Sequence, residues 1–273
     1  MASQHLSATA AAPLLALRGV GKAYANGTLA LQNVSFDVAA GEFVSLVGPS
    51  GCGKSTVLRI VAGLGDVTDG TVLVDGLPPR RARRERNEMA FVFQDPTLMP
   101  WRTVQANVEL PLELRGLEVR SRASRHARAR EALATVGLAD HAAAYPRELS
   151  GGMRMRVSIA RALAASPRVL LMDEPFGALD EMTRQRLNSE LLRICALASW
   201  TVLFVTHNVF EAVFLSDRVL VMSRRPGRIA ADIAIDLPYP REPALRTAPG
   251  YTALVARVSE ALHEAGAEED AAA

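Results

Sequence analysis

Eight residues that run from Gly48 to Ser55 constrain the fold more than any other part of the chain. Their sequence, GPSGCGKS, fits the pattern GxxxxGK[ST], and it lies between an apolar run at 42–47 and a stretch with helical spacing at 55–62. Glycines at such a junction let successive backbone N–H groups turn toward a phosphate, and the helix N-terminus adds a partial positive charge. The pattern therefore predicts a phosphate-binding loop between a buried strand and a helix.

The end of this loop supplies the charged and polar side chains. Lys54 is one of only two lysines in the chain, the other being Lys22, so its presence here calls for an explanation. We expect the Lys54 ammonium to bind the β- and γ-phosphates of ATP and the Ser55 hydroxyl to bind Mg²⁺. A flexible glycine turn is the alternative, which the flanking strand and helix disfavour. The nucleotide contacts expected from the loop are Gly48, Pro49, Ser50, Gly51, Cys52, Gly53, Lys54 and Ser55.

A second motif lies where another apolar run ends. Residues 169–172 are continuously apolar, and Asp173 and Glu174 follow them directly. A buried strand that ends in two carboxylates can hold Mg²⁺ through the first and polarise an attacking water through the second. Taken alone, the pair is equally compatible with solvated carboxylates at a helix N-terminus. The phosphate loop elsewhere in the chain favours the catalytic interpretation.

The third motif is the sequence LSGGM, from Leu149 to Met153. Ser150 is a good N-cap for a helix that runs to about residue 165, and Gly151 and Gly152 leave bare N–H groups that could hold an anion. By itself this motif predicts only a capped helix.

The remaining pattern indicates one α/β domain. Short β-forming runs at 14–17, 34–38, 42–47 and 71–74 predict a partly antiparallel sheet, and the apolar runs at 169–172, 201–205 and 219–222 indicate further strands, the first two buried and parallel. Residues 100–165 and 179–197 favour helices, as do apolar residues spaced between 251 and 262. We expect a domain at 14–245 with a helical lobe at about 100–165, then a C-terminal helix and tail at 246–273, frayed from Glu264.

Composition excludes several classes of protein. A formal net charge of +2 gives no global positive field, so no nucleic-acid partner is expected, and the arginines at 80–86 and 120–130 are interpreted as solvated faces. The apolar runs are far shorter than the roughly 18 residues of a membrane-spanning helix, and residues 1–12 lack the pattern of a secretory signal. Cys52 and Cys195 belong to no Cys/His array, so we expect reduced thiols without metal.

Five motifs together resemble a known family. The phosphate loop, LSGG, the Asp173-Glu174 strand end, the sequence GALD at 177–180 and Thr206-His207 occur in the order and spacing of ABC transporter ATPase subunits, over about residues 14–230. The resemblance implies a P-loop NTPase core with a parallel sheet, an N-terminal antiparallel β subdomain and an inserted α-helical lobe. The sequences at 149–154, 176–180, 211–217 and 236–241 are similar to the branch that energises nitrate, sulfonate and taurine importers.

The resemblance also assigns roles to residues that no motif alone would single out. Tyr24 is similar to the aromatic residue that stacks on adenine, and Thr56 is expected at the α-phosphate. Gln94 is similar to the glutamine that contacts Mg²⁺ and the water, and His207 to the histidine that contacts the γ-phosphate. The alternatives are an ordinary strand aromatic for Tyr24, a surface polar residue for Gln94 and a satisfied core histidine for His207. The implied catalytic set is Glu174, His207, Gln94 and Lys54; the implied metal ligands are Ser55, Gln94 and Asp173.

The resemblance further implies partners and a location. In the family, the LSGG loop reaches the nucleotide bound by a second ATPase subunit. We therefore expect a homodimer, or a pair with a sister ATPase, that clamps two ATP molecules on transmembrane permease subunits. A solute-binding protein outside the membrane would be an indirect partner, and this chain would lie in the cytoplasm on the inner face of the membrane. The alternatives are an importer for another small organic molecule, a soluble ABC ATPase of DNA repair or translation, and a kinase that uses only the phosphate loop.

Overall fold

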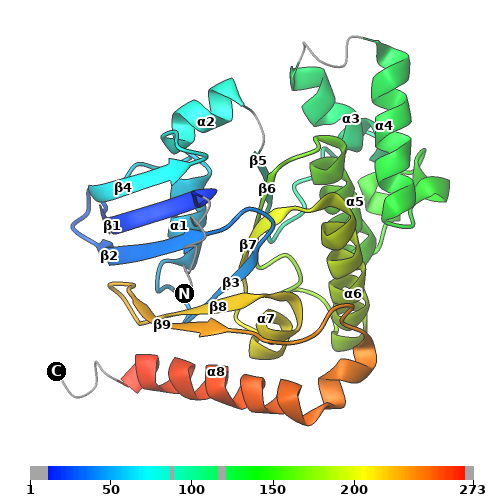
Figure 1. The fold of residues 1–273 in the computed structure, drawn as a ribbon. Coiled ribbons are helices and arrows are strands. Elements are labelled where there is room, and N and C mark those ends of the chain that lie inside the picture. The colour runs from blue at the N-terminus through cyan, green and yellow to red at the C-terminus, as the bar shows by residue number, and fades with distance from the viewer. Residues whose placement is uncertain (1–11, 87–88, 116–120, 268–273) are drawn as a thin grey trace, which may run out of the picture.

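Two β-sheets form the framework of the protein in its computed structural model, which describes residues 12–86, 89–115 and 121–267 (Figure 1). The smaller sheet is antiparallel, with strand order β2-β1-β4. The larger has the order β5-β6-β7-β3-β8-β9, and its pairs are parallel except for β9 against β8. The strands are β1 (Leu15–Ala23), β2 (Leu29–Val38), β3 (Phe43–Val47), β4 (Asp69–Val74), β5 (Met89–Val92), β6 (Val169–Asp173), β7 (Thr201–Val205), β8 (Arg218–Met222) and β9 (Ile229–Ala234).

Helices lie in the connections between these strands, and a further helix follows the last strand. The α-helices are α1 (Lys54–Val61), α2 (Pro79–Glu85), α3 (Val104–Arg115), α4 (Arg122–Thr135), α5 (Gly151–Ala164), α6 (Glu181–Ala198), α7 (Val209–Leu215) and α8 (Pro249–Ala267). Three short 3-10 turns join them, η1 (Ala139–His141), η2 (Pro146–Glu148) and η3 (Pro243–Thr247). The helical lobe expected at 100–165 contains α3, α4 and α5, drawn in green in Figure 1.

The central strands are apolar throughout because both faces of the larger sheet are covered. Successive side chains of a strand point to opposite faces. Accordingly, Leu171 and Leu203 pack with α1 and the smaller sheet, whereas Met172 and Phe204 pack with α5, α6 and α7. None of the described helices is long and apolar enough to span a bilayer.

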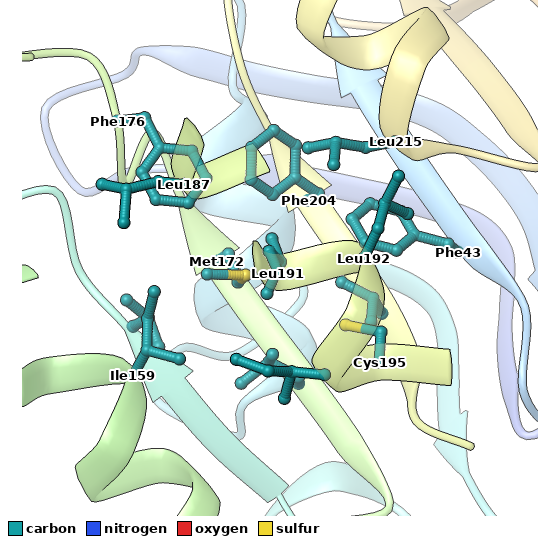
Figure 2. Close-up of a cluster of buried hydrophobic side chains, with 14 of the residues drawn as sticks. Phe43, Ile159, Met172, Phe176, Leu187, Leu191, Leu192, Cys195, Phe204 and Leu215 are labelled. Carbon is teal, nitrogen blue, oxygen red and sulfur yellow. The ribbon is translucent and has the colours of Figure 1, made fainter. Parts of the chain in front are cut away.

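An aromatic core supports the edge of the larger sheet where the chemical motifs lie (Figure 2). Phe204 of β7 lies between Phe43 and Phe176, with ring centroids 5.8 Å and 6.2 Å away, and all three side chains are buried. Leu187 and Leu191 of α6 belong to the same cluster. Because Phe176 is only two residues beyond Glu174, this packing anchors the segment that carries the second motif.

Several elements differ from the sequence-based expectation. The strands β5 and β9 and the seven-residue helices α2 and α7 were not predicted. The separate antiparallel sheet of the N-terminal strands, by contrast, agrees with the subdomain that the family resemblance implied, and β3 belongs to the parallel core. Fraying from Glu264 is wrong for residues 264–267, because α8 continues to Ala267 and buries Ala265 there; the rest of the expected tail, 268–273, lies outside the described residues, as does Arg120.

Candidate functional site

Three of the sequence motifs meet at one edge of the larger sheet. The phosphate loop follows β3, Asp173 ends β6, and Thr206 and His207 follow β7. These three strands are parallel neighbours in the order β6-β7-β3, so their carboxyl ends lie side by side. Open parallel sheets bind ligands at this edge. The fold therefore brings together residues that are more than 150 positions apart in the sequence.

The phosphate loop is tightly packed around its lysine. Lys54 is 5% exposed, and its ammonium donates hydrogen bonds to the carbonyl oxygens of Gly48 at 2.8 Å and Pro49 at 2.9 Å. Arg225 donates from Nε and from a terminal nitrogen to the Gly51 carbonyl, at 3.2 Å and 2.9 Å. Gly53 has φ of +108°, and a Cβ there would lie 2.6 Å from the side chain of Leu31. Only glycine fits that position, which explains why a glycine directly precedes Lys54 in the phosphate loop.

The first residues of the loop helix face the strand-end carboxylate. Ser55 donates from its hydroxyl to Asp173 Oδ1 at 2.9 Å. Burial raises the pKa of Asp173, while the Ser55 hydrogen bond opposes that shift and the Glu174 charge adds to it. A half-buried carboxylate with an adjoining hydroxyl is an oxygen donor set that suits Mg²⁺. The two side chains predicted to hold the metal are thus in contact.

Glu174 and His207 form the second contact of the site. His207 Nδ1 lies 3.0 Å from Glu174 Oε2, and the histidine side chain is exposed rather than part of the core. The Glu174 backbone has φ of +46°, a conformation that is uncommon for a residue with a side chain. Two backbone hydrogen bonds hold it, from Glu174 N to Val205 O at 2.9 Å and from Gly177 N to Glu174 O at 3.1 Å. Backbone outliers of this kind concentrate at functional sites.

Gln94 joins this group from just beyond the end of the adjoining strand β5. A Cβ placed on Gly177 would lie 3.6 Å from the Gln94 amide nitrogen and 3.6 Å from His207 Cε1. Gln94 and His207 therefore flank the same glycine, which is part of the GALD motif at 177–180. Gln94 itself is exposed, so its amide is free to face a ligand.

Tyr24 lies directly after β1 at the smaller sheet. Its hydroxyl is 3.1 Å from the Thr56 hydroxyl, and its ring is largely exposed. The Lys22 ammonium lies 5.4 Å from the ring centroid. This contact brings the predicted adenine-stacking residue to the first turn of α1, beside the residue predicted at the α-phosphate.

The LSGG motif takes a different place. Ser150 N-caps α5 by accepting a hydrogen bond from Met153 N at 3.2 Å, as predicted. Gly151 and Gly152 face the beginning of α6, where an added Cβ would lie 3.8 Å from Leu179 and 3.0 Å from Thr183. Among residues 12–86, 89–115 and 121–267, no hydrogen bond joins these three residues to the phosphate loop.

Sequence reasoning missed residues that support the site from a distance. Arg225 belongs to none of the motifs, although it holds the phosphate loop. Arg184 donates to the carbonyls of Phe176 and Leu179 beside the GALD motif. Neither residue belongs to a local pattern. Arg225 acts on a carbonyl that is distant in the sequence, and Arg184 contacts backbone carbonyls, which have no sequence signature.

Comparisons with known proteins agree with this geometry. The family described as ABC transporter matches residues 31–177, more than half of the chain. The chain belongs to this family. An ATP-binding protein of Brucella abortus is 47% identical over 89% of this cassette and 92% of its own length. The nitrate import ATP-binding protein NrtD of Synechocystis is 48% identical over 78% of each chain. The aliphatic sulfonates import ATP-binding protein SsuB of Bacillus cereus is 42% identical over 83% of this cassette and 88% of its own length.

Solved structures confirm the fold. A dimeric, post-hydrolysis state of an ATP-binding cassette bound to ADP and Pi is similar with a TM-score of 0.73 and 35% identity, over 82% of this chain and 99% of that chain. The expected α/β P-loop fold is therefore confirmed. As an ABC transporter cassette, the protein binds ATP and hydrolyses it, and it resembles the branch that includes nitrate and sulfonate importers.

Proposed function

We propose that this cassette is the ATPase subunit of an importer for nitrate, sulfonate or taurine-type solutes, in which Glu174 activates the hydrolytic water. The observation that carries the catalytic part is the Glu174–His207 contact beside the phosphate loop. Glu174 would accept a proton from the water, and His207 would hold the γ-phosphate and the carboxylate in register. A carboxylate whose backbone is fixed by hydrogen bonds on both sides is well placed for that role.

The ground-state contacts fall to the other residues of the edge. Lys54 and the loop N–H groups would hold the β- and γ-phosphates, Thr56 the α-phosphate, and Tyr24 the adenine ring by stacking. Ser55, Asp173 and Gln94 would hold Mg²⁺, which neutralises charge on the phosphates when bound. The Ser55–Asp173 hydrogen bond supports two of these three ligands directly.

The placement of the LSGG motif supports a composite site. Gly151 and Gly152 lie beside Leu179 and Thr183 near the beginning of α6, and Ser150 caps α5. Their N–H groups at the start of α5 would serve ATP bound by a second copy of the cassette, head to tail. The dimeric form of the solved relative supports this arrangement.

A groove of about 530 Å³ between β5 and the helical lobe is the proposed docking site for the permease. Its lining includes Phe91 and Phe93 of the β5 region and Leu114 of α3, which is among the most exposed large apolar residues. Arg161 forms part of the wall, and its guanidinium donates to the carbonyl oxygens of Pro96 and Thr97. An apolar helix from a membrane subunit would fit such a groove, on the inner face of the membrane. Because Gln94 follows β5, movement there would reach the site.

The decisive experiment is Glu174→Gln. The substitution keeps size and a hydrogen bond to His207 but removes the base, so steady-state phosphate release should fall about 10²- to 10⁴-fold while ATP affinity stays within a few-fold of wild type. Lys54→Ala is the matched comparison, because it should lower ATP affinity itself. Turnover of Glu174→Gln close to wild type would contradict the assignment.

The composite site is tested by mixing inactive subunits. Lys54→Ala and Ser150→Arg chains should each lack activity, and their mixture should regain part of it, because one of the two sites then has an intact loop and an intact LSGG motif. Strict coupling between the sites could hide this rescue, so ATP-dependent dimerisation of Glu174→Gln is followed in parallel by light scattering. If mixing restores nothing and Glu174→Gln stays monomeric at saturating ATP, the head-to-tail proposal fails.

The solute proposal needs partner proteins. The isolated cassette should not bind nitrate, taurine or sulfonates in calorimetry, whereas co-expression with the permease and solute-binding protein encoded beside it should give ATP-dependent uptake of one of them. Uptake of only an unrelated organic solute would replace this part of the proposal and leave the ATPase assignment intact.

A further inference from the structure

One buried carboxylate has no place in the chemistry proposed above. Glu211 lies in the first turn of α7 and is 3% exposed. Ionisable side chains are rarely buried to this extent without a specific partner. The sequence around it was noticed only as part of the resemblance at 211–217.

On one side, Glu211 holds the residue that precedes His207. The Thr206 hydroxyl donates to Glu211 Oε2 at 2.5 Å and accepts from Asn208 N at 3.0 Å. Asn208 in turn N-caps α7 by accepting from Glu211 N at 3.2 Å. The backbone on both sides of His207 is therefore tied to one carboxylate and to the helix that carries it.

On the other side, Glu211 faces α6. Burial raises the pKa of Glu211, whereas the Thr206 hydrogen bond, the Arg184 charge and the Asn188 side chain all favour its ionised form. Asn188 is almost fully buried. The Thr206 hydrogen bond is thus the contact that holds this buried carboxylate at the turn after β7.

Arg184 of the same helix α6 pairs with Glu181 at 2.9 Å and holds the GALD segment at 177–180. It donates from Nε to Phe176 O at 3.4 Å and from a terminal nitrogen to Leu179 O at 2.8 Å. Both carbonyls belong to the segment that follows Glu174 and that borders His207 and Gln94 at Gly177. A planar guanidinium that donates to two backbone carbonyls fixes the positions of both oxygens.

We propose that Glu211 is a positioning residue for ATP hydrolysis, which holds the His207 turn against α7 through Thr206. This inference rests on the proposed catalytic roles of Glu174 and His207. Because His207 borders Gly177, the carboxylate keeps the histidine in position beside Gln94 and the 177–180 segment.

The contacts also say why a carboxylate is needed there. A hydrogen bond from a hydroxyl to an ionised carboxylate is roughly twice as strong as one between neutral groups. Glutamine can still accept from Thr206, yet only through the weaker, neutral hydrogen bond. The expected consequence is a His207 turn and a 177–180 segment that shift relative to each other, with loss of turnover rather than of nucleotide affinity.

The experiment compares Glu211→Gln, Thr206→Val and the double variant, using steady-state phosphate release and ATP affinity. Each single variant should lower kcat on the order of tenfold, with ATP affinity within about twofold of wild type. The double variant should fall little further, because both changes break the same link. Glu42→Gln is the matched control: Glu42 pairs with Arg218 at 2.6 Å at the opposite end of β3, so it should cost stability and leave kcat unchanged.

The outcomes separate this inference from the proposed function. If folded Glu211→Gln and Thr206→Val keep kcat within twofold of wild type while His207→Ala loses it, Glu211 is only a packing group and the inference is overturned. If Glu211→Gln fails to fold, Thr206→Val decides alone, since it removes one hydroxyl without burying a new polar group. Turnover retained by both Glu174→Gln and His207→Ala would instead overturn the catalytic roles and the inference with them.

Discussion

Packing beneath the site gives a prediction that separates stability from catalysis. Phe176 is fully buried against Phe204, and its backbone lies two residues from Glu174. Replacing Phe176 by Leu removes part of the ring volume and one aromatic pair, so the free energy of unfolding should fall by about 2 kcal/mol. In a chain of this length, that corresponds to roughly 4–8 °C in Tm. Alanine would cost about 3–5 kcal/mol and could prevent folding, so leucine is the useful change.

Phe43→Leu is its matched control. Phe43 is also buried and pairs with Phe204 from the other side, but it begins β3 at the end of the sheet away from the phosphate loop. Both variants should lose similar stability in thermal unfolding. Only Phe176→Leu should lower kcat, by several-fold, because only its cavity lets the strained Glu174 backbone relax. Equal kcat values for the two folded variants would refute the idea that this core positions the catalytic loop.

Three further predictions concern single residues. Cys195 is buried with a pKa raised to about 12, so in a thiol-reagent assay at pH 8 it should stay unmodified in the folded protein and react after denaturation; labelling at equal rates would show that α6 opens. Burial raises the pKa of Tyr239 to about 12, so the folded state holds this proton more tightly and stability should fall as pH rises from about 10 to about 12; Tyr239→Phe should flatten that slope in alkaline unfolding, and an unchanged slope counts against the shift. Gly53→Ala should weaken ATP binding at least tenfold in calorimetry, because a side chain is strained at φ of +108° and its Cβ would crowd the Ala30 carbonyl as well as Leu31; normal affinity would mean that the loop adapts.

The parts of the fold that the sequence predicted are those with a local signature. The phosphate loop, the Asp173-Glu174 strand end and the Ser150 cap each combine a turn chemistry with an apolar run, and each lies where expected. The missed elements lack such a signature. α2 and α7 are two turns long, which is too short to show a helical period, and β9 is a partly exposed edge strand.

The supporting residues of the site could not be predicted from the sequence for another reason. Arg225 acts on a carbonyl that is 174 positions away, and Glu211 joins a turn to a helix through side chains whose spacing follows no motif. Contacts of this kind follow from how strands are ordered in the sheet. The order β6-β7-β3 is set by tertiary packing, and one sequence does not contain a local pattern for it.

Two separate sheets contribute to the nucleotide site, and this division has a consequence for how such a cassette can change over time. Tyr24 directly follows a strand of the small antiparallel sheet, whereas Lys54 and His207 follow strands of the large one and Asp173 ends another. With the proposed roles, residues of the small sheet region hold the adenine ring and those of the large sheet hold the triphosphate. Substitutions near Tyr24 can therefore alter the preference among purine and pyrimidine nucleotides without disturbing the groups that cleave the terminal phosphate. Selection can adjust which nucleotide is bound independently of the residues that hydrolyse it.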